Sequence, residues 1–106
     1  MAKFLVQASY SVDGIKGVVA KGGTARREAV EKMAADLGGH IEAFYFSFGE
    51  SDAVIVLDLP DNVGAAAIGL AVSATGMAAT RTTVLLTPEE IDRAAATSVS
   101  YLPPGA

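Results

Sequence analysis

The chain has no cysteine and no tryptophan, and it has one histidine among its 106 residues. Without cysteine there are no disulfide bonds, no thiolate metal sites and no cysteine nucleophiles. A single histidine also removes most of the usual zinc and haem ligand sets. We therefore expect neither a metal ion nor an organic cofactor.

Basic residues are few: eight lysines and arginines stand against twelve aspartates and glutamates, for a net charge of −4. Nucleic-acid binding depends on a basic stripe, and the sequence has none. No apolar run approaches the roughly 20 residues of a membrane helix, and the first residues lack the apolar core of a secretory signal. We expect no nucleic-acid partner, no membrane partner and a cytoplasmic location.

Hydrophobic residues, in contrast, make up 51% of the chain. The length fits a single domain over residues 1–106, and the mean hydropathy of +0.39 is high for such a domain. Monomers rarely expose large apolar patches. This surplus therefore predicts a homodimer or a larger homo-oligomer.

The order of the predicted elements indicates an α+β fold. Alternating apolar residues predict strands, and amphipathic runs bounded by capping residues predict helices, with Ser11, Thr24, Asp61 and Thr87 as the N-caps. The strands are expected over 3–10, 40–48, 53–59 and 77–86, and the helices over 11–20, 24–37, 61–74 and 87–98. This βαββαβ order with a C-terminal helix predicts a ferredoxin-like, four-stranded antiparallel sheet.

Two of the predicted strands are apolar on both faces. The strand over 53–59 alternates Ala, Ile and Leu on one face with Val on the other. In the strand over 40–48, one face carries three phenylalanines and the other carries Ile41, Ala43 and Tyr45. Helices on one side would leave the second sheet face bare, so we expect that face to pack on another chain.

Several segments, in this order, resemble the GYD domain family, a set of small bacterial proteins related to the dimeric α/β-barrel superfamily. The segments are QASY, GGTARREAVEKMAADLGG, EAFYFSFGESD, DLPDN, LLTPEE and SYLPPG, which together span residues 4–105. The resemblance implies a dimeric α/β barrel and no established reaction. Ser51 stands where the family has its name-giving tyrosine, between Gly49 and Asp52.

Two carboxylates in the predicted hairpin, Glu50 and Asp52, form the first candidate site. Carboxylates this close can bind a hard cation or share a proton. A polar turn uses the same residue types, and we favour that interpretation.

The adjacent arginines Arg26 and Arg27 form the second candidate site. They fall in the first turn of a predicted helix, where positive charge opposes the helix dipole. With the backbone N–H groups of Gly22 and Gly23, they are suited to an anionic ligand. Ion pairing across an interface is the alternative, and we favour it.

The third candidate is His40, with Glu42 two residues later on the same strand face; an imidazole beside a carboxylate can act as a general base. A solvated strand end is the alternative. The last candidates are polar side chains on the second sheet face, where they suit either a ligand pocket or paired groups at an interface. They are Gln7, Ser9, Tyr45, Ser47 and Thr83.

Three functions fit these features. The protein is a binding module for a small apolar or anionic molecule, an assembly element, or a cofactor-independent enzyme of the oxygenase, isomerase or decarboxylase type. The enzyme would use His40, Tyr45 and Asp52 as acids and bases. Because few titratable groups converge, we place binding or assembly ahead of catalysis.

Overall fold

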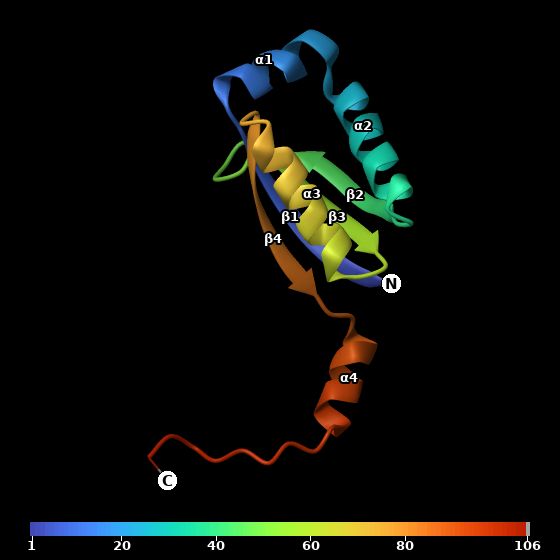
Figure 1. The fold of residues 1–106 in the computed structure, drawn as a ribbon, viewed down its shortest axis with the longest axis vertical. Coiled ribbons are helices and arrows are strands. Elements are labelled where there is room, and N and C mark those ends of the chain that lie inside the picture. The colour runs from blue at the N-terminus through green and yellow to red at the C-terminus, as the bar shows by residue number, and fades with distance from the viewer. Residues whose placement is uncertain (106) are drawn as a thin grey trace.

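Three of the four helices lie on one face of a four-stranded antiparallel sheet in the computed structural model, which describes residues 1–105 (Figure 1). The strands are ordered β2-β3-β1-β4, so the predicted α+β, ferredoxin-like fold is confirmed. The elements are β1 (Ala2–Tyr10), α1 (Val12–Lys21), α2 (Gly23–Asp36), β2 (His40–Phe46), β3 (Ala53–Leu59), α3 (Asn62–Ala74), β4 (Ala78–Leu85) and α4 (Pro88–Ala96).

The hydrophobic core lies between the sheet and helices α2 and α3. Phe4 of β1 and Leu57 and Leu59 of β3 are almost completely buried there. Helix α2 contributes Val30 and Ala34 to this core, and α3 contributes Ala65 and Ile68. Burying a large aliphatic or aromatic side chain contributes about 1.5–3 kcal/mol, so this layer accounts for much of the stability of the domain.

Three of the four helices begin at the predicted capping residue. The side chains of Ser11, Asp61 and Thr87 each accept a hydrogen bond from a backbone N–H of the first turn. Helix α2 differs, because its N-cap is Gly22, at φ 87°, and Thr24 lies inside the helix. One glycine in the left-handed region is enough to turn the chain from α1 into α2, so the prediction that Thr24 caps this helix is wrong.

A β-bulge at Glu42 changes the expected faces of β2. Ile41 pairs with Leu57 whereas Ala43 pairs with Val56, so the alternation is interrupted between them. Ile41 therefore packs towards the helices and not, as predicted, on the same face as Ala43. The strand also ends at Phe46, two residues earlier than expected.

The second face of the sheet is not covered by any helix of residues 1–105. We call it the open sheet face, and its central residues are Leu5, Gln7, Tyr45, Val54 and Val56. The apolar character predicted for this face is present, because leucine and valine side chains hold its centre.

The segment over residues 87–105, here called the C-terminal arm, leads away from the sheet (Figure 1). Its helix α4 has no buried residue. Ile91, Val99, Tyr101 and Leu102 of the arm are between 50% and 78% exposed. Within the described residues, no helix is long and apolar enough to cross a membrane.

Candidate functional site

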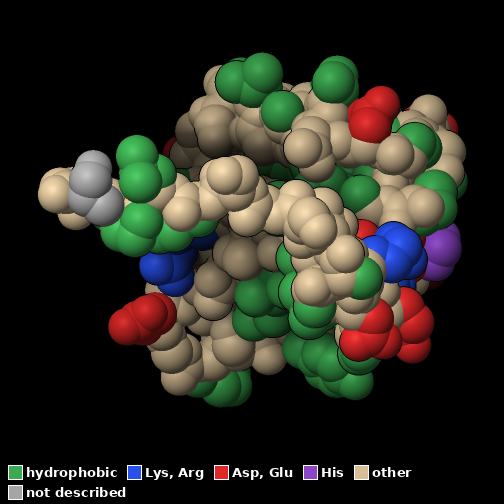
Figure 2. All heavy atoms as spheres, turned by 90° about the horizontal axis from the view of Figure 1, so that it is seen from below, with side chains coloured by type: hydrophobic (Ala, Val, Ile, Leu, Met, Phe, Trp, Pro, Cys, Tyr) green, Lys and Arg blue, Asp and Glu red, His purple; other side chains and the backbone are tan. Residues whose placement is uncertain are grey.

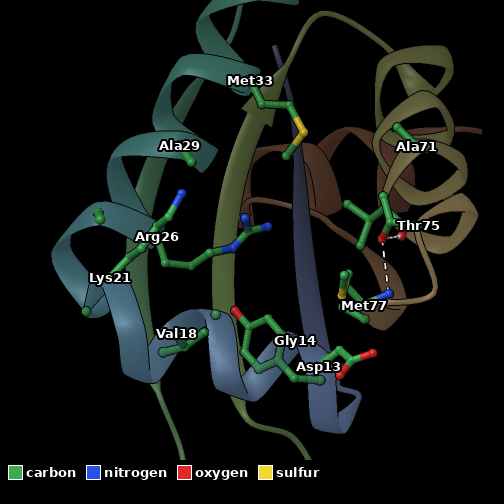
Figure 3. Close-up of a pocket in the computed structure, with 16 residues that line it drawn as sticks. Asp13, Gly14, Val18, Lys21, Arg26, Ala29, Met33, Ala71, Thr75 and Met77 are labelled. Carbon is green, nitrogen blue, oxygen red and sulfur yellow. Dashed lines mark hydrogen bonds between the residues drawn. The ribbon is translucent and has the colours of Figure 1, made fainter.

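A cavity of about 650 Å³, open to solvent on one side, lies on the helix side, bounded by α1, α2, the end of α3 and the start of β4 (Figure 3). Small residues on the three helices leave this space, because they cannot fill the gap between the backbones. They include Gly14, Gly17, Ala25, Ala29 and Ala71. The larger lining side chains are mostly apolar, among them Val18, Met33, Val72 and Met77.

Helix α1 is fastened to the turn before β4 at one end of this cavity. The carbonyl oxygen of Met77 accepts hydrogen bonds from the backbone N–H of Ser11 at 2.9 Å and from its hydroxyl at 3.1 Å. A Cβ on Gly14 would lie 2.1 Å from the same oxygen. The absence of a side chain at Gly14 therefore allows α1 to form this wall of the cavity.

Arg26 extends from α2 into the cavity, towards the space between α2 and α3 (Figure 3). Its Nε atom is buried and has no hydrogen-bond partner among the described residues. The other charged lining residues are Asp13 and Lys21, and Arg26 forms no ion pair with any residue in 1–105. A narrow cleft of about 30 Å³ continues below Arg26 towards the sheet, between Val6 and Ile68.

The two candidate arginines point to different environments. Arg27 lies outside the cavity, where its Nε is 3.2 Å from Oε1 of Glu31, one turn along the same helix. Both side chains of this pair are about half exposed. Arg27 thus forms an ordinary surface ion pair, whereas Arg26 retains unpaired hydrogen-bond donors inside the cavity.

A cluster of charged residues, here called the Asp58 cluster, lies at the β1-β3-β2 side of the open sheet face. The Asp58 side chain is 7% exposed, and its oxygens lie 2.9 Å from Nζ of Lys3 and 3.0 Å from Nε2 of His40. Lys3 also contacts Oε2 of Glu42 at 2.8 Å. Figure 2 shows the histidine beside basic and acidic side chains at the edge of the molecule.

The Asp58 cluster changes the expected pairing of His40. The histidine contacts Asp58, and Glu42, displaced by the bulge, contacts Lys3 instead. Hydrogen bonds from Lys3 to the carboxylates of Glu42 and Asp58 raise the pKa of the Lys3 ammonium group above its ordinary value. Lys3 is therefore charged throughout the neutral range.

The hairpin carboxylates do not converge. Oδ2 of Asp52 accepts the backbone N–H of Tyr10 at 2.8 Å, and the Asp52 N–H donates to the carbonyl of Ala8 at 2.8 Å. Asp52 therefore ties the hairpin loop to the end of β1, while Glu50 is exposed. Across residues 1–105, no group of three or more His, Asp or Glu side chains is placed to hold a metal ion.

Ser51 is 5% exposed, although it lies in this loop. Its carbonyl accepts a hydrogen bond from the Ser47 hydroxyl, and its own hydroxyl accepts one from Nη2 of Arg81 at 3.4 Å. Ser51, which stands where the resemblance places the family's tyrosine, is therefore buried in the protein.

The polar residues predicted for the second sheet face do not line the cavity. Gln7 and Tyr45 lie on the open sheet face, and the hydroxyl of Ser9 is 3.5 Å from the carbonyl of Glu50. A role for them in ligand binding stays a prediction. Sequence reasoning missed most of the cavity lining, and the spacing of Gly14 and Gly17 within α1 is the signal that indicates it.

The strand order and the one-sided helices define an α+β protein of the ferredoxin-like class, with a cavity on the helix side and an open sheet face. A family model described as GYD domain matches residues 4–95, so the chain belongs to the GYD domain family. The match spans the sheet and α1 to α3 and nearly all of α4, and the SYLPPG segment falls outside it. The searches of curated proteins and of solved structures found no match to the chain.

Proposed function

We propose that this protein is a homo-oligomeric binding module that needs no cofactor. Its ligand is a small organic molecule that occupies the helix-side cavity. The cavity itself is the observation that carries the proposal. Its volume of about 650 Å³ is within the range of small-molecule sites, about 300–1,000 Å³. Apolar walls with a few polar groups are also typical of such sites.

The oligomer is supported by two surfaces of the same chain. The open sheet face displays Leu5, Val54 and Val56, and the C-terminal arm displays Tyr101 and Leu102. A stable interface uses about 20–30 residues on each side, so we expect both surfaces to take part. A second copy that packs on the open sheet face would form the dimeric α/β barrel that the family resemblance implies.

A cavity-filling variant tests the binding proposal. Ala71 and Ala74 are both exposed alanines of α3, but only Ala71 lines the cavity. The Ala71→Leu and Ala74→Leu variants are titrated with methyl 2-naphthoate, an uncharged aromatic probe with intrinsic fluorescence. We expect the wild type and Ala74→Leu to bind the probe and Ala71→Leu to lose at least tenfold in affinity. Equal binding by Ala71→Leu and Ala74→Leu would refute the location in the cavity.

The alternative function, a cofactor-independent enzyme of the oxygenase, isomerase or decarboxylase type, is favoured by the geometry of His40. The contact of Nε2 with the buried carboxylate of Asp58 at 3.0 Å leaves Nδ1 to accept a proton. Tyr45 lies on the same open face, which a barrel would enclose. Deuterium exchange at the α-carbon of 2-acetylnaphthalene tests this chemistry. If the protein is such an enzyme, we expect the wild type to catalyse the exchange and His40→Gln to abolish it. Equal exchange rates with and without wild-type protein would refute proton abstraction by His40.

A further inference from the structure

We propose that the ligand of the cavity is an organic monocarboxylate with an apolar body, and that its carboxylate pairs with the guanidinium of Arg26. This inference rests on the proposed function, because it names the chemical class of the molecule that the same cavity takes.

The first argument is that the buried Nε–H of Arg26 is energetically unfavourable without a ligand. Its Nε atom is buried without a partner among the described residues. A guanidinium has N–H donors and no acceptor, so the buried Nε–H can be satisfied only by an acceptor brought to it. A buried donor without a partner destabilises the fold. A carboxylate matches the planar guanidinium with two parallel hydrogen bonds, and it would remove this cost.

The second argument is the charge of the lining. Asp13 and Lys21 carry opposite charges, and Arg26 adds one positive charge that no residue in 1–105 pairs. A singly charged anion balances this charge, whereas a phosphate monoester carries about −1.5 to −2 at neutral pH. The lining therefore favours a carboxylate over a phosphate ester.

The third argument is the environment that surrounds the guanidinium. Ala29 and Met33 follow Arg26 along one side of α2, and Ala71 faces them from α3 (Figure 3). Val72 adds further apolar surface to the wall formed by α3. A ligand whose carboxylate meets Arg26 would lay its remaining atoms against these side chains, so that part of the molecule is apolar.

The test compares three naphthalene probes at neutral pH: 2-naphthoate, its methyl ester, and 2-naphthyl phosphate. The proteins are the wild type, Arg26→Met and Arg26→Lys, with Arg27→Met as the matched control. Arg27 is the adjacent arginine, and its ion pair lies on the surface. Affinities are measured by fluorescence titration, and thermal unfolding of each protein is followed with and without the probe.

We expect the wild type and Arg27→Met to bind 2-naphthoate at least tenfold more tightly than the methyl ester and the phosphate. Arg26→Met removes this preference, and Arg26→Lys, which keeps the charge but not the planar fork, retains part of it. Without ligand, Arg26→Met unfolds at a temperature no lower than the wild type, because the substitution removes an unpaired buried donor.

Three results would overturn the inference: equal affinity of the wild type for the acid and its ester, unchanged naphthoate binding by Arg26→Met, or tightest binding of the phosphate. A lower unfolding temperature of Arg26→Met together with normal binding would identify Arg26 as a structural residue. If the methyl ester binds and naphthoate shows no advantage, the proposed function stands and only the carboxylate assignment fails. If none of the three probes binds, the proposed function fails.

Discussion

Replacing Asp58 by asparagine tests the energetic role of the Asp58 cluster. The substitution keeps the shape of the side chain and removes the charge that meets Lys3 and His40 at 2.9 and 3.0 Å. Hydrogen bonds to charged groups contribute about 1.5–3 kcal/mol each. The loss falls below the combined range of about 3–6 kcal/mol for two such bonds, because Lys3 keeps its contact with Glu42 and is 30% exposed, so solvent screens part of its charge.

We therefore expect Asp58→Asn to lower the free energy of unfolding by about 2 kcal/mol, which for a domain of this size corresponds to a decrease of roughly 8–16 °C in Tm. Urea unfolding followed by circular dichroism measures the difference. The control is Asp36→Asn, because Asp36 also pairs with a lysine, Lys32, at 2.9 Å but with both side chains mostly exposed. Such a surface pair contributes about 0.3–0.5 kcal/mol.

The contribution of the Lys3–Asp58 pair to stability depends on pH, because the pKa of Lys3 is raised in the folded protein. A base whose pKa is raised by folding contributes stability below its ordinary pKa and loses it as the pH rises through the raised value. The difference between the wild type and Asp58→Asn is therefore complete at pH 7 and decreases in strongly alkaline solution. A loss below about 0.5 kcal/mol at pH 7, or one equal to that of Asp36→Asn, would refute the reasoning.

Four further predictions concern the helices and the C-terminal arm. Gly14→Ala should destabilise the protein by about 1–3 kcal/mol in urea unfolding, because its Cβ would lie 2.1 Å from the carbonyl oxygen of Met77. Gly17→Ala, with open space at its Cβ, should be neutral or stabilising. Similar free energies of unfolding for the two variants would show that the Met77 carbonyl does not restrict position 14. Thr87→Ala should reduce amide-exchange protection in α4 by about 1 kcal/mol without changing global unfolding, because α4 has no buried residue. The hydrogen bond from the Thr87 N–H lowers the pKa of Glu90, so α4 should keep this protection above the ordinary carboxyl pKa and lose it as the pH falls through the lowered value. Deleting the C-terminal arm should leave the unfolding of the remaining domain unchanged and dissociate the proposed oligomer into monomers. An unchanged number of subunits in analytical ultracentrifugation would exclude the arm from the interface.

Local signals along the chain were sufficient for most of the fold. Alternation located the strands, and Ser11, Asp61 and Thr87 located three helix starts because each has a side chain that accepts from the first turn. The start of α2 at Gly22 could not be predicted, because it depends on the positive φ of this glycine. A glycine permits such a backbone angle but does not dictate it. The bulge at Glu42 was missed for a related reason, since an extra residue in a strand depends on the partner strand.

The candidate site was harder to predict, because its residues meet only through the packing of helices. Arg26 and Arg27 are adjacent and chemically identical, and the start of α2 decides which one faces the cavity. Asp58 interrupts an apolar strand, but its importance depends on Lys3 lying opposite it in the register of β1 and β3. Neither relationship is visible in residue types alone.

The alignment of β3 with its neighbours also depends on Asp58. Most of this strand is apolar on both faces, so a shift by one residue would still present aliphatic side chains to the helices and to the open sheet face. The same shift would carry the Asp58 carboxylate into the helix-covered layer, away from Lys3, where an unpaired charge is strongly unfavourable. The charge of Asp58 thus adds to the native strand pairing a preference that the aliphatic pattern of β3 supplies only weakly. We expect chains with an aliphatic residue at this position to form sheets of mixed register even where their stability is high.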